Sequence, residues 1–107
     1  MKIFITGSKG FIGKELVLQC EKQGIDFLGV DLPETDIRKK ELIDLIPEGA
    51  DAIIHLAALS SDPYCKNRAL ECFETNVMAT LNLMEAAAKK EVKQFIFASS
   101  ERVYDNC

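Results

Sequence analysis

Three glycines near the start of the chain have the spacing of a phosphate-binding turn. Gly7, Gly10 and Gly13 lie between a short apolar run, residues 1–5, and a longer amphipathic run. Gly7 permits a tight turn after a strand, Gly10 lets a pyrophosphate approach the backbone, and Gly13 lets the following helix pack closely on a sheet. The N–H groups and the positive dipole end of that helix would then face the anion. The spacing therefore predicts a phosphate cradle.

An acidic residue extends this prediction from a phosphate to a nucleotide. Asp31 directly follows the second apolar run, residues 26–30, where a carboxylate can bind the 2′-hydroxyl of an adenosine ribose. A Walker-type nucleotide loop is excluded, because Ser8 stands where that loop has glycine and Glu15 where it has serine or threonine. The alternative is a turn that is purely structural.

Composition narrows the class of protein. The 107 residues suffice for one domain, and the net charge of -4 with both signs interspersed argues against a nucleic-acid partner. The four cysteines have no CxxC spacing and only one histidine accompanies them, so we expect reduced thiols and no metal site. No apolar run approaches the ~20 residues that span a bilayer, and the first strand begins without a signal peptide. We therefore expect a cytoplasmic protein with no membrane partner.

Hydrophobic periodicity predicts alternating strands and helices. The predicted strands are residues 1–5, 26–30, 51–58 and 94–98, with 34–37 as at most a short additional strand. The predicted helices are residues 11–23, 39–46 and 69–90. This alternation predicts an α/β fold with a doubly wound parallel sheet of about four to five strands, in the order third, second, first, fourth, fifth. The long helix is expected to bury one face, formed by Phe73, Val77, Leu81, Met84 and Ala88.

Six motifs, taken in order, carry a resemblance over essentially the whole chain. They are TGSKGFIG at 6–13, Asp31, the Asp-Ile pair at 36–37, HLAA at 55–58, NVMATLNL at 76–83 and SSERVY at 99–104. The sequence resembles the extended branch of the short-chain dehydrogenase/reductase superfamily, the NAD-dependent epimerases and dehydratases of nucleotide sugars. Ala79 departs from that pattern, which has glycine there. The resemblance implies a Rossmann-type NAD(P)-binding domain over residues 1–107, without the substrate-binding region.

The resemblance also assigns the cofactor contacts. They are Gly7, Lys9, Gly10, Phe11, Ile12, Gly13, Asp31, Asp36, Ile37, Leu56, Ala57, Ala58 and Asn76. In the family the Asp36-Ile37 pair would lie against the adenine ring. NAD is favoured over NADP because Asp31 would repel a 2′-phosphate, although some reductases of the superfamily place a cation at the position of Lys9.

The resemblance places Ser100 on the catalytic serine, which would orient the substrate oxygen during hydride transfer. Without the resemblance, Ser100 is interpreted as a serine that ends a strand. His55 is interpreted as a satisfied strand-end histidine rather than a base, and Asn76 as either a buried amide or a solvent-facing one. The family's Tyr-x-x-x-Lys pair is missing, because Tyr64 is followed by Arg68 at the fourth position. We therefore expect this chain alone to be inactive.

Several functional readings stay open. The short stretch between Asp31 and Asp36 is more typical of deoxysugar reductases, and Arg102 argues against a dehydratase. A non-catalytic NAD(P)-binding regulatory module and a fragment without ligand are alternatives to a nucleotide-sugar enzyme. The apolar strand at 94–98 would form an open sheet edge without protective charges, so we expect more chain or a second subunit to cover it, for example in a homodimer.

Overall fold

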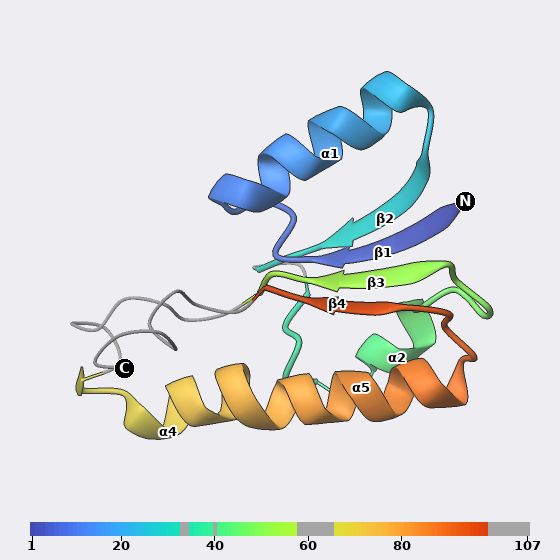
Figure 1. The fold of residues 1–107 in the computed structure, drawn as a ribbon. Helices are drawn as coiled ribbons and strands as arrows, with labels where there is room; N and C mark the ends of the chain where they lie inside the picture. Colours follow the sequence, from blue (N-terminus) through green and yellow to red (C-terminus); the bar gives the residue numbers. More distant parts are fainter. Residues whose placement is uncertain (33–34, 40, 58–65, 99–107) are drawn as a thin grey trace, which may run out of the picture.

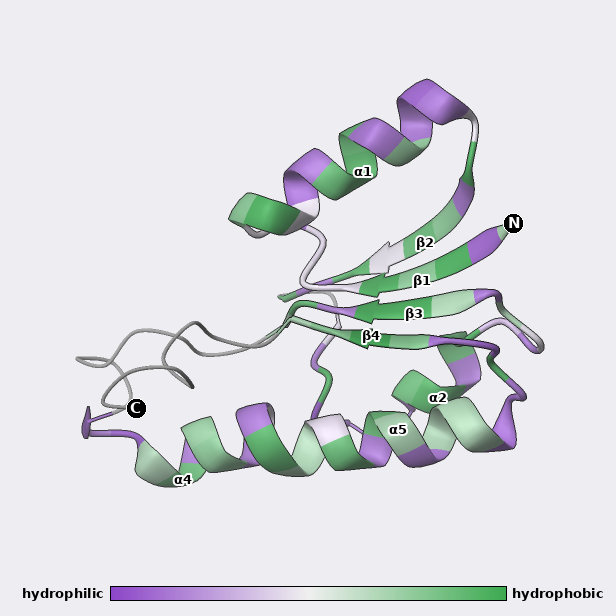
Figure 2. Cartoon of the chain, viewed as in Figure 1, coloured by the Kyte–Doolittle hydropathy of each residue, from purple (hydrophilic) through white to green (hydrophobic). Residues whose placement is uncertain are grey.

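The computed structural model describes residues 1–32, 35–39, 41–57 and 66–98. Its centre is a parallel sheet of four strands in the order β2-β1-β3-β4, with helices on both faces (Figure 1). The strands are β1 (Lys2–Thr6), β2 (Asp26–Val30), β3 (Ala52–His55) and β4 (Phe95–Phe97). Figure 2 shows them as a largely hydrophobic layer, as expected for strands covered on both sides. The predicted doubly wound parallel sheet is confirmed.

Helix α1 (Phe11–Gln23) covers one face of the sheet and connects β1 to β2 (Figure 1). It ends, as its sequence predicts, at Gly24, whose φ of 66° is left-handed and whose N–H donates to the carbonyls of Cys20 and Glu21. On its inner side Cys20 packs with Ile3 and Ile5 of β1. Phe27 of β2 packs against the same cluster, so this helix covers both β1 and β2.

The other face of the sheet carries a long helical rod and a short helix. The rod consists of α4 (Ala69–Phe73), a π-helical turn (Glu74–Met78) and α5 (Ala79–Lys89). The short helix α2 (Leu42–Leu45) is smaller than the predicted 39–46. The additional strand at 34–37 is not formed at residues 35–37, because Asp36 begins a turn in which its carbonyl accepts from the N–H of Lys39 at 3.0 Å.

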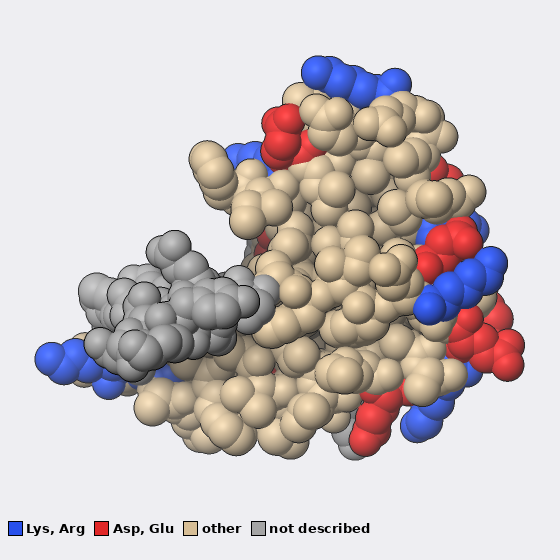
Figure 3. Space-filling view, in the orientation of Figure 1, with Lys and Arg blue, Asp and Glu red and all other residues tan. Residues whose placement is uncertain are grey.

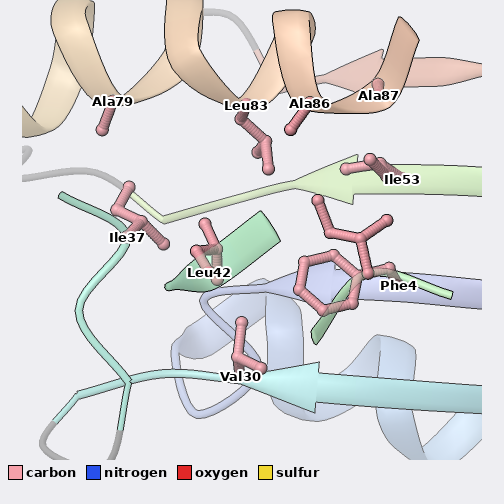
Figure 4. Packing of buried hydrophobic residues seen from close by; sticks show 10 residues of the cluster. Phe4, Val30, Ile37, Leu42, Ile53, Ala79, Leu83, Ala86 and Ala87 are labelled. Carbon is pink, nitrogen blue, oxygen red and sulfur yellow. The ribbon is translucent and has the colours of Figure 1, made fainter. Parts of the chain in front are cut away.

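The buried face of the rod is not the predicted one. Phe73, Val77, Leu81 and Met84 are about half exposed, and Ala88 is exposed as well. The buried positions follow a neighbouring stripe and are Cys72, Thr75, Ala79, Leu83, Ala86 and Ala87. Figure 4 shows Leu83, Ala86 and Ala87 facing the side chains of Phe4 and Ile53, which rise from the sheet. The prediction is wrong because the large side chains that fill this interface come from the sheet, so the helix packs against them with its stripe of mostly small residues.

The cysteines divide into two kinds. Cys20 is free and buried, as predicted. Cys72 is disulfide-bonded. The prediction of reduced thiols is therefore wrong for Cys72, because the missing CxxC spacing says nothing about cysteines that the fold brings together.

Within the described ranges, no helix is long and apolar enough to cross a membrane. Figure 3 shows acidic and basic side chains mixed along the rim of the face in view, and the described residues form no basic patch there.

Candidate functional site

The candidate site is a cleft of about 240 Å³ at the carboxyl ends of the central strands. Here the chain leaves β1 for α1 on one face of the sheet, whereas the chain after β3 leads to the rod on the other face (Figure 1). Such a switch point is where open α/β sheets bind ligands. Seven predicted cofactor residues line the cleft, namely Gly7, Gly10, Asp31, Asp36, Ile37, Leu56 and Ala57.

The glycine turn has the predicted geometry at Gly7 and Gly10, whereas Gly13 makes a different contact from the one predicted. Gly7 has a φ of 73°, and a Cβ there would lie 2.8 Å from the backbone nitrogen of Ala57. A Cβ on Gly13 would lie 2.1 Å from the carbonyl oxygen of Gly7, so Gly13 packs on the turn itself rather than on the sheet. A Cβ on Gly10 would meet only that carbonyl oxygen, at 3.4 Å. Beyond that oxygen, the space beside the Gly10 Cα is open, as the approach of a pyrophosphate to the backbone would require.

Asp31 has a structural role that the sequence did not reveal. One of its carboxylate oxygens accepts from the backbone N–H of Lys9 at 2.9 Å, and the other accepts from the N–H of Leu32 at 2.7 Å. The carboxylate therefore holds the glycine turn against the end of β2. Because a carboxylate has about four acceptor positions, it can still bind ribose hydroxyls.

Asp36 forms an ion pair across the wall of the cleft. The Arg38 guanidinium donates to both of its carboxylate oxygens, the shortest contact being 2.7 Å from Nη2 to Oδ2. The N–H of Arg38 also donates to Oδ1 at 2.9 Å. The side-chain hydrogen bonds from Arg38 are the main cause that lowers the pKa of Asp36. The sequence reading missed Arg38, although a basic residue two positions after an acid in a turn is a usable signal.

His55 lies at the end of β3, is 1% exposed and has a hydrogen bond on each ring nitrogen. Nδ1 lies 2.7 Å from Oγ1 of Thr6, and Nε2 lies 2.8 Å from Oγ1 of Thr80. Burial lowers the pKa of the imidazole. The interpretation as a satisfied strand-end histidine is therefore confirmed.

The remaining predicted residues lie around the cleft or outside the description. The side chains of Phe11 and Ile12 are exposed at the first turn of α1, so any contact with an anion there would come from backbone N–H groups. Asn76 is half-buried in the π-helical turn, one residue after Thr75 in the cleft wall. Ala58 and Ser100 lie outside the described residues.

Known proteins resemble both the sequence and the fold. UDP-glucose 4-epimerase of Caenorhabditis elegans is 31% identical over 97% of this chain and 39% of its own length. The structure of MoeE5 in complex with UDP-glucose and NAD matches with a TM-score of 0.89 and 31% identity, over 100% of this chain and 39% of that one. RMD from Pseudomonas aeruginosa complexed with NADPH matches with a TM-score of 0.81 and 29% identity, over 100% and 38%. The chain thus spans less than half the length of these relatives.

The sequence model of one family covers nearly the whole chain. It is described as the NAD dependent epimerase/dehydratase family, and it matches residues 3–107. The match includes the glycine turn, Asp31 and the wall formed by Leu56 and Ala57. This chain belongs to the NAD-dependent epimerase/dehydratase family.

Proposed function

We propose that this chain is the NAD-binding portion of an enzyme that acts on a nucleotide sugar by hydride transfer. The observation that carries the proposal is the open glycine turn beside Asp31 at the switch point of a parallel sheet. The nicotinamide of bound NAD would supply the hydride acceptor. Gly10 and the first turn of α1 would hold the pyrophosphate, and Asp31 the adenosine ribose.

The charges around the cleft favour NAD over NADP. A 2′-phosphate on the ribose would lie beside the carboxylate of Asp31, and like charges repel at close range. The Arg38 guanidinium, a cation lining the same cleft, is engaged by Asp36. Because the structure of RMD holds NADPH, the affinities of this chain for NAD and NADP should both be measured.

The substrate and reaction are proposed from the relatives. MoeE5 binds UDP-glucose, and the C. elegans relative is an epimerase, so a nucleotide-sugar epimerase or oxidoreductase is favoured. A relative of the deoxysugar reductases is the alternative within the family. Ser100 would orient the reacting oxygen. Because the sequence has no Tyr-x-x-x-Lys pair, the chain by itself would lack the group that moves the proton.

A non-catalytic NAD(P)-binding regulatory module is the second candidate. It rests on the same glycine cradle, which could bind a dinucleotide without catalysing a reaction. In either case we propose a cytoplasmic protein that self-associates. The half-exposed apolar residues of the rod, together with Ile96 and Phe97 on the edge strand β4, support an interface between copies.

Calorimetric titration with NAD, NADH and NADP tests cofactor binding. We expect NAD to bind more tightly than NADP, and Asp31→Asn to narrow that difference. Asp26→Asn, an exposed acid at the opposite end of β2, is the matched control and should leave both affinities unchanged. No binding of any dinucleotide to the wild-type chain would refute the proposal.

A second assay tests whether the chain is catalytic by itself. The chain is mixed with NAD and UDP-glucose, and NADH is followed by its absorbance. We expect no NADH from the chain alone. Substrate-dependent NADH would show that it is catalytic by itself.

A further inference from the structure

The two hydrogen bonds of His55 continue through Thr6 and Thr80 to backbone groups, and these backbone groups determine which atom donates in each bond. On the helix side, Oγ1 of Thr80 donates its only hydrogen to the carbonyl oxygen of Asn76, at 3.0 Å. It must therefore accept, rather than donate, in its 2.8 Å contact with Nε2 of His55. Nε2 consequently carries a hydrogen.

The strand side gives the same answer independently. Oγ1 of Thr6 accepts from the N–H of Leu56 at 3.1 Å and from the N–H of Ala57 at 3.2 Å. These two donors occupy both lone pairs of the hydroxyl, so its hydrogen must point to Nδ1 of His55, 2.7 Å away. Nδ1 is therefore an acceptor without a hydrogen. Both sides require neutral imidazole with the hydrogen on Nε2.

We propose that His55 is a positioning residue whose neutral, Nε2-protonated ring orients the Thr6 hydroxyl and thereby fixes the Leu56–Ala57 wall of the cleft against the turn at Gly7. The inference rests on the proposed function, because it assigns this wall to the cofactor. The N–H of Leu56 has a second acceptor in the carbonyl of Thr6 at 3.2 Å, so Ala57 depends more on the hydroxyl. The backbone of Ala57 lies so close to Gly7 that no Cβ fits between them. Any outward movement of Ala57 would therefore separate the cleft wall from the glycine turn.

A protonated ring cannot support this arrangement. Imidazolium would direct a third N–H at the Thr6 oxygen, which has two lone pairs, so one of the three N–H groups would lose its hydrogen bond to this hydroxyl. The described groups around the ring are uncharged: Thr6 on β1, Thr80 on α5, and the rings of Phe95 and Phe97 on β4 at 6.1 and 5.8 Å. They offer the imidazolium no compensating charge.

The ring itself can be observed directly, because His55 is the only histidine of the chain. A two-bond proton–nitrogen correlation spectrum of the full ¹⁵N-labelled chain at neutral pH therefore contains a single imidazole pattern. We expect the pattern of the neutral tautomer with the hydrogen on Nε2. A hydrogen on Nδ1, or on both nitrogens, would overturn the inference.

The positioning role is tested at Thr6. Thr6→Val should speed hydrogen exchange at the N–H of Ala57 and weaken NAD binding about tenfold, the effect of one buried hydrogen bond left unmade. Thr6→Ser, which keeps the hydroxyl, should have the wild-type exchange rate at Ala57 and the wild-type NAD affinity. Ile3→Val, a buried change on the same strand away from the cleft, should lower stability without moving either readout. Unchanged exchange at Ala57 in Thr6→Val would refute the role.

Failure of the two proposals can be told apart. If the wild-type chain binds no dinucleotide, the proposed function fails, while the tautomer and the exchange rate of Ala57 still decide whether His55 holds this wall. If Thr6→Val does not fold, Thr80→Val removes the acceptor of Nε2 instead. It should also accelerate exchange at Ala57, and an unchanged rate there would count against the inference.

Discussion

Gly10→Ala is the sharpest test of the phosphate cradle, because it should separate ligand binding from stability. Gly10 has a φ of -74° and a ψ of 179°, an extended conformation that alanine adopts freely. The new Cβ would lie 3.4 Å from the carbonyl oxygen of Gly7, at the edge of ordinary van der Waals contact. The free energy of unfolding should therefore change by less than about 0.5 kcal/mol.

The same methyl group would stand where the pyrophosphate must approach the backbone. Displacing the phosphate would break one or two charge-assisted hydrogen bonds, each worth about 1.5–3 kcal/mol. NAD affinity should therefore fall by at least about tenfold. Calorimetry measures the affinity, and urea unfolding followed by circular dichroism measures the stability.

Two other glycines provide the controls. Gly24→Ala places alanine at a φ of 66° with nothing within 4 Å, so it should cost about 1 kcal/mol of stability and leave NAD affinity unchanged. Gly13→Ala puts a Cβ 2.1 Å from a carbonyl oxygen and should lower both. If Gly10→Ala binds NAD as tightly as the wild type, the phosphate does not sit on this turn.

Three further predictions follow from other contacts. Burial lowers the pKa of His55 below 6.5, so the unfolded chain binds the proton more tightly than the folded chain does. The stability that comes from the neutral ring is therefore complete above about pH 6.5 and is lost as the pH falls. Urea unfolding from pH 5 to 7.5 should show this decrease in the free energy of unfolding, and His55→Phe should remove it. Arg38→Met should raise the lowered pKa of Asp36 toward 3.8 in a carboxyl NMR titration, and an unchanged pKa would contradict the ion pair as its cause. In the wild type, the stability that this pair contributes should be lost as the pH falls below 3.8. Leu81→Glu, on the exposed stripe of the rod, should reduce self-association in sedimentation while circular dichroism stays unchanged, and an unaltered association state would exclude this surface.

Much of the fold could be predicted because its signals are local. The glycines of the turn, the helix end at Gly24 and the apolar runs of the strands each depend on residues close in sequence. The rod has two apolar stripes side by side, and only the sheet decides which one is buried. The side chains of Phe4 and Ile53 select the stripe of small residues, a tertiary effect that helical periodicity does not contain.

Seven of the residues predicted to contact the cofactor line one cleft, but the sequence did not predict the hydrogen bonds that hold this cleft together. The spacing predicts a ribose contact for Asp31. Its hydrogen bond to the Lys9 N–H joins positions 22 apart, and the bond between Thr6 and His55 joins positions 49 apart, so neither is visible in local sequence. Such pairs arise only when parallel strands align their carboxyl ends. Arg38 was missed because its pairing depends on the turn that replaces the expected strand.

Asp31 has an observed role in the glycine turn and a proposed role at the ribose, and both affect how its substitution should be interpreted. Its carboxylate accepts from the N–H groups of Lys9 and Leu32, so it holds the glycine turn in addition to the ribose contact proposed for it. Asp31→Asn would exchange one acceptor oxygen for a donor and loosen the turn as well as the ribose contact. Loss of NAD affinity in this variant therefore overstates the ribose contact. The ratio of NAD to NADP affinity isolates it, because a loosened turn weakens both cofactors alike.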